Sequence, residues 1–351
     1  MPVNTAPQSV SPADSSADSP AAGPVPSGGA LQALALGALK RIAFVGTARA
    51  RLSILIFHRV LPQPDPLFPD EVDAARFDAQ LALLQQCFTI IPLGQGIEAL
   101  RSNRLPPRAA CITFDDGYAD NAEIALPILQ RHGLHATFFV ASGFLDGGRM
   151  WNDTVIELVR RAPAELDLRA AGHGHFALAG IDQRRAAIAT LLGELKYLPL
   201  DERGERIAAL CALARIALPD DLMMRASQVR QLHQAGMTIG AHTVNHPIVA
   251  RLGADQARSE IADGKQALET IIGAPVTVFA YPNGKPGQDY LAPHVAMVKE
   301  LGFEAAVSTS WGAARPQGDL FQLPRFTPWD RDPLRFMLRM ARNLRSDGVT
   351  V

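Results

Sequence analysis

The chain has 351 residues, of which 48% are hydrophobic and 20% charged, and its formal net charge is −1. This length and composition are ordinary for a globular protein of one large or two small domains. The near-neutral charge and the lack of a basic face exclude a nucleic-acid partner. The three cysteines stand far apart in the sequence, so we expect free thiols rather than a disulfide framework; they are Cys87, Cys111 and Cys211.

The first fifty residues predict two segments outside the globular body. Residues 1–29 are rich in Ser, Ala, Pro and Gly, which predicts a disordered tail without the features of a secretory signal. Residues 30–50 predict an amphipathic helix, since the apolar run 31–46 is interrupted by Lys40 and Arg41 and is too short to span a bilayer. This helix either packs on the body or makes a peripheral membrane contact through residues 31–46. We therefore expect a cytoplasmic or membrane-associated protein.

Residues 51–332 predict one domain in which strands alternate with helices. Alternation of this kind is typical of parallel strands and an α/β fold. In such folds the chemistry gathers at the carboxyl ends of the strands. The expected strands are 53–60, 88–92, 109–114, 136–140, 237–241, 277–280 and 305–308, and the clearest expected helices are 74–86, 121–132 and 254–272.

Two further segments depart from this alternation. Residues from about 151 to 222 contain several helical runs and few strand-like ones, which predicts a helical insertion carried on the α/β body. Residues 333–351 predict a C-terminal helix and tail. The insertion is expected to shape one wall of a substrate groove.

A pair of adjacent carboxylates, Asp115 and Asp116, follows the apolar strand 109–114. Two such charges are costly to place at the end of a buried strand unless a positive group lies beside them. Because Asp116 and Gly117 also form a common turn pair, the motif alone indicates either a turn or a functional site.

Two histidines spaced four residues apart, His242 and His246, follow the strand 237–241. On a helical turn this spacing lets both imidazoles meet one ion. Two imidazoles and one carboxylate are a recurring ligand set for catalytic zinc. The histidine pair together with the double Asp therefore predicts a metal site.

Three motifs, TFDDG (113–117), HTVNH (242–246) and FAYPNG (279–284), occur in this order and resemble the NodB-type polysaccharide deacetylases of carbohydrate esterase family four. The resemblance covers roughly residues 52–330 and implies a distorted (β/α) barrel with a helical insertion. The runs ILIFHRVLPQPDP (54–66) and FVASGFLDGGRMWND (139–153) are similar to bacterial members linked to exopolysaccharide assembly. The three motifs are specific for the family only in combination and in this order, and no single one of them is.

The resemblance implies an enzyme that removes N-acetyl groups from N-acetylglucosamine-type units of a polysaccharide or oligosaccharide, using a divalent metal for which zinc is the expected ion. By motif position, Asp116, His242 and His246 are the metal ligands. Asp115 is the general base that takes a proton from the attacking water. The backbone N–H of Asn283 is the donor to the developing oxyanion.

The third motif departs from the family pattern. The family has an Arg two residues before the Pro, where this chain has Ala280, and an aromatic residue where it has Asn283. Arg325, near the last predicted strand, is either a replacement for the missing guanidinium or a structural surface residue.

The late Leu-x-His motif of the family, whose His protonates the leaving group, is also absent, since no His follows His294. His58 at the end of the first strand is the candidate substitute. It can equally be a residue hydrogen-bonded to the site or a structural strand-end His. Trp151, Asn152 and Asp153 precede the insertion, and Trp151, like Trp311 and Trp329, either stacks on a sugar or packs in the core.

Several functions share this set of groups. The same site can act on peptidoglycan or on an ester-linked acetate. A catalytically inactive carbohydrate-binding protein on the same fold is a further alternative, motivated by the missing Arg and His. The intact ligand set and base favour an enzyme.

Overall fold

The computed structural model describes residues 51–351, so the tail and amphipathic helix predicted within residues 1–50 lie outside the described residues. Its strands are β1 (Leu52–Phe57), β2 (Thr89–Ile90), β3 (Ala109–Phe114), β4 (Thr137–Val140), β5 (Glu165–Asp167), β6 (His175–Ala177), β7 (Thr238–Ala241), β8 (Val278–Ala280), β9 (Ala305–Trp311) and β10 (Leu323–Arg325). Its α-helices are α2 (Ala74–Cys87), α3 (Leu93–Arg101), α4 (Leu126–Arg131), α5 (Trp151–Arg161), α6 (Ile181–Leu195), α7 (Leu200–Ala214), α8 (Ala226–Gln234), α9 (Ala254–Ile272), α10 (Ala292–Glu300) and α11 (Pro333–Asn343).

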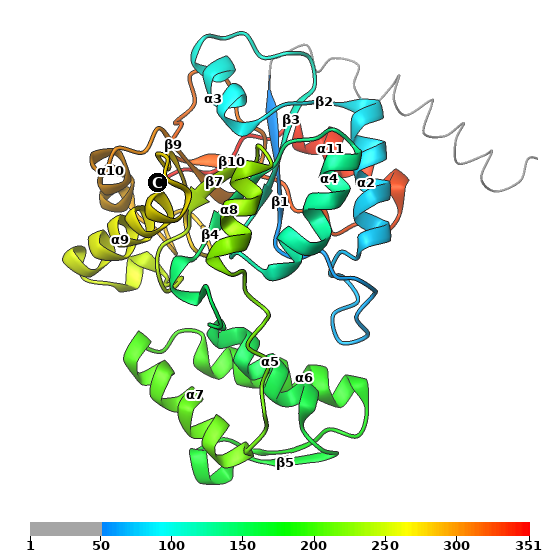
Figure 1. Ribbon diagram of the computed structural model, residues 1–351, viewed down its shortest axis with the longest axis vertical. Helices are drawn as coiled ribbons and strands as arrows, with labels where there is room; N and C mark the ends of the chain where they lie inside the picture. Colours follow the sequence, from blue (N-terminus) through cyan, green and yellow to red (C-terminus); the bar gives the residue numbers. More distant parts are fainter. Residues whose placement is uncertain (1–50) are drawn as a thin grey trace, which may run out of the picture.

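Seven parallel strands form a nearly closed barrel in the order β1-β3-β4-β7-β8-β9-β10, and β2 extends the sheet beside β3 (Figure 1). Backbone hydrogen bonds join β1 to the residue after β10. The N–H of Ile56 donates to the carbonyl of Phe326 at 3.0 Å, and the N–H of Phe326 donates to that of Ile54 at 2.7 Å. The predicted distorted (β/α) barrel is confirmed.

The side chains of the strands alternate between two apolar clusters, as the two-residue period of a strand requires. One set packs inside the barrel with α3; it includes Leu52, Ile54, Cys111, Phe139 and Val307. The alternate set packs against the surrounding helices and includes Leu55, Phe57, Phe114, Phe138 and Ala306. Both faces of the strands are therefore buried, and polar side chains gather at the strand ends.

Residues 151–214 form a helical layer with its own apolar core between α5, α6 and α7, beside the barrel (Figure 1). It leaves the body after β4, so it lies at the carboxyl end of the strands. It also contains the antiparallel hairpin β5–β6, which the sequence analysis did not predict. Strands of three residues are too short to show an alternating apolar pattern.

Other elements differ from prediction in detail. The strand expected at 88–92 is reduced to the two residues of β2, and the helix expected at 121–132 begins as a π-helical turn, Asn121–Ala125, before α4. None of the three cysteines, all within residues 51–351, forms a disulfide, as predicted, and two of them are buried. Within residues 51–351 no helix is both long and apolar enough to cross a membrane.

Candidate active site

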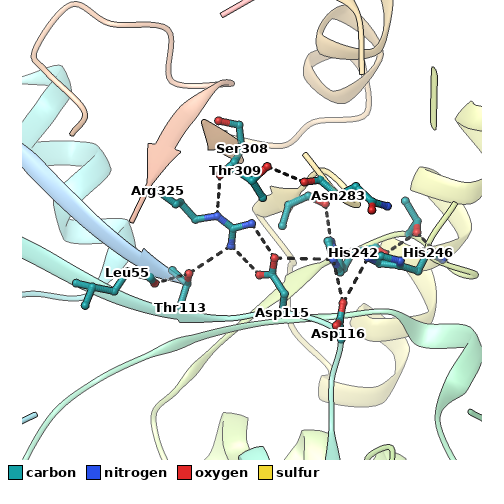
Figure 2. A network of polar contacts seen from close by, with 12 residues as sticks. Leu55, Thr113, Asp115, Asp116, His242, His246, Asn283, Ser308, Thr309 and Arg325 are labelled. Atoms are coloured by element: carbon teal, nitrogen blue, oxygen red, sulfur yellow. Dashed lines mark hydrogen bonds and ion pairs between the residues drawn. The ribbon is translucent and has the colours of Figure 1, made fainter. Parts of the chain in front are cut away.

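Asp115 and Asp116 directly follow the end of β3. The N–H of Asp115 still donates to the carbonyl of Phe57 on β1, at 2.9 Å, whereas Asp116 takes a left-handed backbone conformation with φ 74°. Such a conformation is uncommon outside glycine, and it ends the strand by turning the chain. Adjacent carboxylates thus point to different partners (Figure 2).

Asp116, His242 and His246 form a set of ligands that fits one metal ion. The Nε2 atoms of both imidazoles lie 3.4 Å from Oδ1 of Asp116, and three potential ligand atoms lie within 4.8 Å of one another. A tetrahedral ion with bonds of about 2.1 Å separates its ligand atoms by about 3.4 Å. Among residues 51–351, Oδ1 of Asp116 is buried without a hydrogen-bond partner, as expected for an atom whose partner is a metal ion.

The ring of His242 is fixed by a hydrogen bond from Nδ1 to the carbonyl of Ala280, at 2.7 Å. A carbonyl oxygen only accepts, so Nδ1 carries the proton and Nε2 presents its lone pair to the ligand cluster. The last residue of β8 therefore orients the side chain of the residue that directly follows β7.

The two histidines do not lie on a helical turn, and that part of the prediction is wrong. The segment after β7 is a loop in which Thr243 and His246 both have left-handed conformations, with φ 65° and 51°. The hydroxyl of Thr243 accepts a hydrogen bond from the N–H of His246 at 3.1 Å. The imidazoles converge because this tight loop reverses the chain.

A buried carboxylate that the sequence analysis missed holds the same loop. Oε2 of Glu260 on α9 accepts hydrogen bonds from the N–H groups of Val244 and Asn245, at 3.0 and 2.8 Å, and Oε1 accepts one from the side chain of Asn245 at 2.8 Å. Glu260 lies on the buried face of α9. The sequence did contain a sign of this role, because Glu260 is a charged residue at a position on the apolar face of α9.

The pKa shifts of Asp116 and His246 favour the forms that bind a metal, whereas the neighbouring carboxylates of Asp115 and Asp116 outweigh burial and raise the pKa of His242. Burial alone would raise the pKa of Asp116, but the contact with His242 and the charge of His246 hold it well below its usual value. Burial lowers the pKa of His246 to about 4, and the nearby Asp116 does not offset this effect. Asp116 is therefore ionised and His246 neutral near pH 7.

Arg325 makes two parallel hydrogen bonds to Asp115, each 2.7 Å long (Figure 2). Its Nε also donates to the carbonyl of Ser308 at 2.8 Å, and only 1% of the residue is exposed. Although burial opposes it, the guanidinium holds the pKa of Asp115 below its usual value. The structure thus places a guanidinium against the predicted base, and Arg325 is not a surface residue.

Asn283 lies in the turn after β8, again with a left-handed conformation of φ 59°. Its carbonyl accepts a hydrogen bond from the hydroxyl of Thr309 at 2.6 Å, which ties the turn to β9. Figure 2 shows this turn beside His242. The oxyanion role of its N–H stays a prediction.

His58 follows β1 and is exposed. The register of β1 on β3 pairs Phe57 with Phe114, which brings His58 level with Asp115 at the same edge of the sheet. His58 lines a cavity together with Asp116. The structure thus brings it to the site, and its role as an acid stays a prediction.

Comparisons with known proteins identify the family and the fold. A family model described as polysaccharide deacetylase matches residues 102–189 and 205–306, more than half of the chain. The chain is 20% identical over 278 residues to YxkH of Bacillus subtilis (strain 168), which carries the name of a polysaccharide deacetylase; the match covers 79% of this chain and 71% of YxkH.

Two solved structures share the fold. The deacetylase PplD of Streptococcus pyogenes, in complex with acetate, has a TM-score of 0.56 and 20% identity, and the match covers 84% of this chain and 99% of PplD. IcaB from Ammonifex degensii has a TM-score of 0.56 and 18% identity, and the match covers 84% of this chain and 97% of IcaB. The matched family model, together with the fold, shows that the chain is a hydrolase that belongs to the polysaccharide deacetylase family.

Proposed function

We propose that the chain removes N-acetyl groups from N-acetylglucosamine-type units of a polysaccharide or oligosaccharide, and that it needs a divalent metal to do so. The observation that supports this most directly is the convergence of Asp116, His242 and His246 beside a fourth group, Asp115. A carbohydrate-binding protein without turnover has no need of a paired carboxylate next to a set of metal ligands.

Asp116, His242 and His246 would hold the metal, and two imidazoles with one carboxylate favour zinc. When bound, the ion would lower the pKa of the attacking water and polarise the acetyl carbonyl. The ligand set leaves positions for both, because it supplies three protein atoms.

Asp115 would accept the proton of the attacking water. Arg325 keeps this carboxylate ionised and fixes its plane, so that one oxygen lies on the ligand side, 3.9 Å from Nε2 of His242. The N–H of Asn283 would stabilise the oxyanion, and His58 would give a proton to the leaving amine. Acetate is the second product, and it is also the molecule named in the PplD complex.

Metal content and acetate release together test the proposal. The protein is stripped with a chelator, reloaded with zinc, and assayed on an N-acetylglucosamine oligomer. We expect about one zinc per chain, and acetate release that is lost on stripping and restored on reloading. A protein that binds the oligomer but releases no acetate with zinc present belongs to the carbohydrate-binding class instead. Release from an acetyl ester or from peptidoglycan, but not from the oligomer, would redirect the substrate assignment.

A further inference from the structure

A cavity of about 360 Å³ opens beside the ligand cluster, between the barrel and the helical insertion. Asp116 contributes to its wall from the barrel, as do His58 and Arg59 from the segment after β1, while Asp153 and Glu157 contribute from α5. Its volume lies within the range of about 300–1,000 Å³ that is usual for small-molecule sites. The insertion thus forms one wall of a space that begins at a metal ligand.

Asp153 is an incompletely satisfied acid in this wall. It lies in the first turn of α5 and is 5% exposed. Its Oδ1 accepts a hydrogen bond from the hydroxyl of Tyr118 at 3.2 Å, whereas its Oδ2 is buried and has no partner in the part of the chain that the structure describes. Buried carboxylate oxygens are almost always hydrogen-bonded, so this atom calls for a partner from outside the described chain.

The nearby cations are already paired with other carboxylates. Arg59 donates to Asp120 at 2.8 Å and lies 4.7 Å from the centre of the Tyr118 ring. Arg160 donates to Asp65 at 2.6 Å and to Glu157 at 2.9 Å. Neither guanidinium donates a hydrogen bond to Asp153, and burial raises the pKa of this acid to about 7. Oδ2 of Asp153 therefore remains open to a hydrogen-bond donor of a ligand in the cavity.

The wall chemistry suits an uncharged, hydroxyl-bearing ligand. Five carboxylates line the cavity, against two guanidiniums and one imidazole; the acids are Asp65, Glu71, Asp116, Asp153 and Glu157. This excess of acid disfavours an anionic ligand. Trp329 also lines the cavity and is 63% exposed, so it offers an apolar ring face at the rim.

We propose that Oδ2 of Asp153 accepts a hydrogen bond from a hydroxyl group of the substrate's sugar, so that the helical insertion holds the sugar while the barrel carries the chemistry. This inference rests on the proposed function. It assigns to Asp153 a part in binding and none in the chemical step.

The variant Asp153→Asn tests the inference with little change of shape, because Asn still accepts from Tyr118 but presents an amide donor in place of Oδ2. Asp182→Asn is the matched control. Asp182 also lies in the first turn of an insertion helix, α6, but its side chain is 95% exposed. Circular dichroism and thermal unfolding are used to check that both variants fold.

Binding of an N-acetylglucosamine oligomer is measured by calorimetry on the zinc-loaded proteins, beside KM and kcat for acetate release. For Asp153→Asn we expect Kd and KM to rise by about tenfold, since an amide donor replaces the acceptor Oδ2 and the hydrogen bond from the sugar hydroxyl is lost, with a much smaller change in kcat. Asp182→Asn should match the wild type.

An unchanged Kd in Asp153→Asn, or a loss confined to kcat, would overturn the inference. Failure of the proposed function looks different, because the wild-type protein itself would then release no acetate. The calorimetric measurement decides the role of Asp153 in either case, since it does not depend on turnover.

Discussion

Two parallel hydrogen bonds join the guanidinium of Arg325 to the carboxylate of Asp115, and both residues are at most 3% exposed. Removal of one partner from a buried ion pair leaves an uncompensated charge and destabilises a protein by about 3–5 kcal/mol. We therefore expect Arg325→Gln to unfold at lower urea concentration. We also expect kcat to fall by about a hundredfold, because the base is no longer fixed.

The pH profile of Arg325→Gln separates this role from a purely structural one. Loss of the guanidinium raises the pKa of Asp115, so the acid limb of the kcat profile should move to higher pH. The control is Arg258→Gln, whose partner Glu300 is exposed. A profile that keeps its acid limb in place would show that Arg325 does not act on the base.

Metal binding and turnover should separate in two variants of the site. Asp115→Asn keeps all three ligands and should retain the metal while losing most turnover. His242→Ala removes a ligand and should lose both. Metal per chain is measured by mass spectrometry after dialysis, and acetate release by an enzyme-coupled assay. Equal metal loss in both variants would mean that the roles of the residues are misassigned.

Glu260→Gln should weaken metal binding without a change to any ligand. The amide would turn a donor toward the side chain of Asn245, which breaks one of the three hydrogen bonds that hold the loop of His246. Changes to groups that orient metal ligands typically reduce metal affinity by about 10- to 100-fold. Competition with a chromophoric chelator measures this affinity.

Glu269→Gln is the matched control for Glu260→Gln. Glu269 lies on the same helix, α9, and also accepts a backbone N–H, from Val276 at 3.0 Å, but it is remote from the loop. An equal loss of affinity in both variants would point to a general effect on α9 rather than to the loop.

Asp153 should make the stability of the protein depend on pH. Burial raises its pKa from 3.8 to about 7, so between these values the folded protein holds a proton that the unfolded chain has released. The free energy of unfolding contributed by this group therefore falls as the pH rises from about 4 to about 7.

Asp153→Asn removes that dependence. Relative to the wild type, we expect the variant to be more stable at pH 7 by on the order of a few kcal/mol, and nearly equal at pH 4. Urea unfolding with a chelator present measures the difference without a contribution from bound metal. A difference that is the same at both pH values would show that the carboxyl is not the cause.

The pairing of Asp115 with Arg325 lies within reach of sequence reasoning. Asp115 continues the alternate positions of β3 that face the barrel interior, after Cys111 and Thr113, and Arg325 follows Leu323 in the same way on β10. Two charged residues on the inner face of a closed sheet must meet or remain unpaired. The strands, the helix α9 and the barrel type were likewise predictable from periodicity and motifs.

Other features of the site depend on contacts that a local pattern does not contain. Four of the nine non-glycine residues with left-handed conformations in residues 51–351 lie at the strand ends of the site: Asp116, Thr243, His246 and Asn283. Their conformations follow from tertiary contacts such as that of Glu260 with its loop. For this reason a helical spacing was wrongly assigned to a histidine pair that a loop brings together.

The parts of the site come together in two stages, because Arg325 reaches it only when the barrel closes. Asp116, His242 and His246 are all present once the first 246 residues have been synthesised, whereas Arg325 belongs to the last strand, which hydrogen-bonds to the first. A growing chain thus contains all three candidate metal ligands before Asp115 has its partner. We therefore expect competence for hydrolysis to arise only when the two ends of the sheet meet.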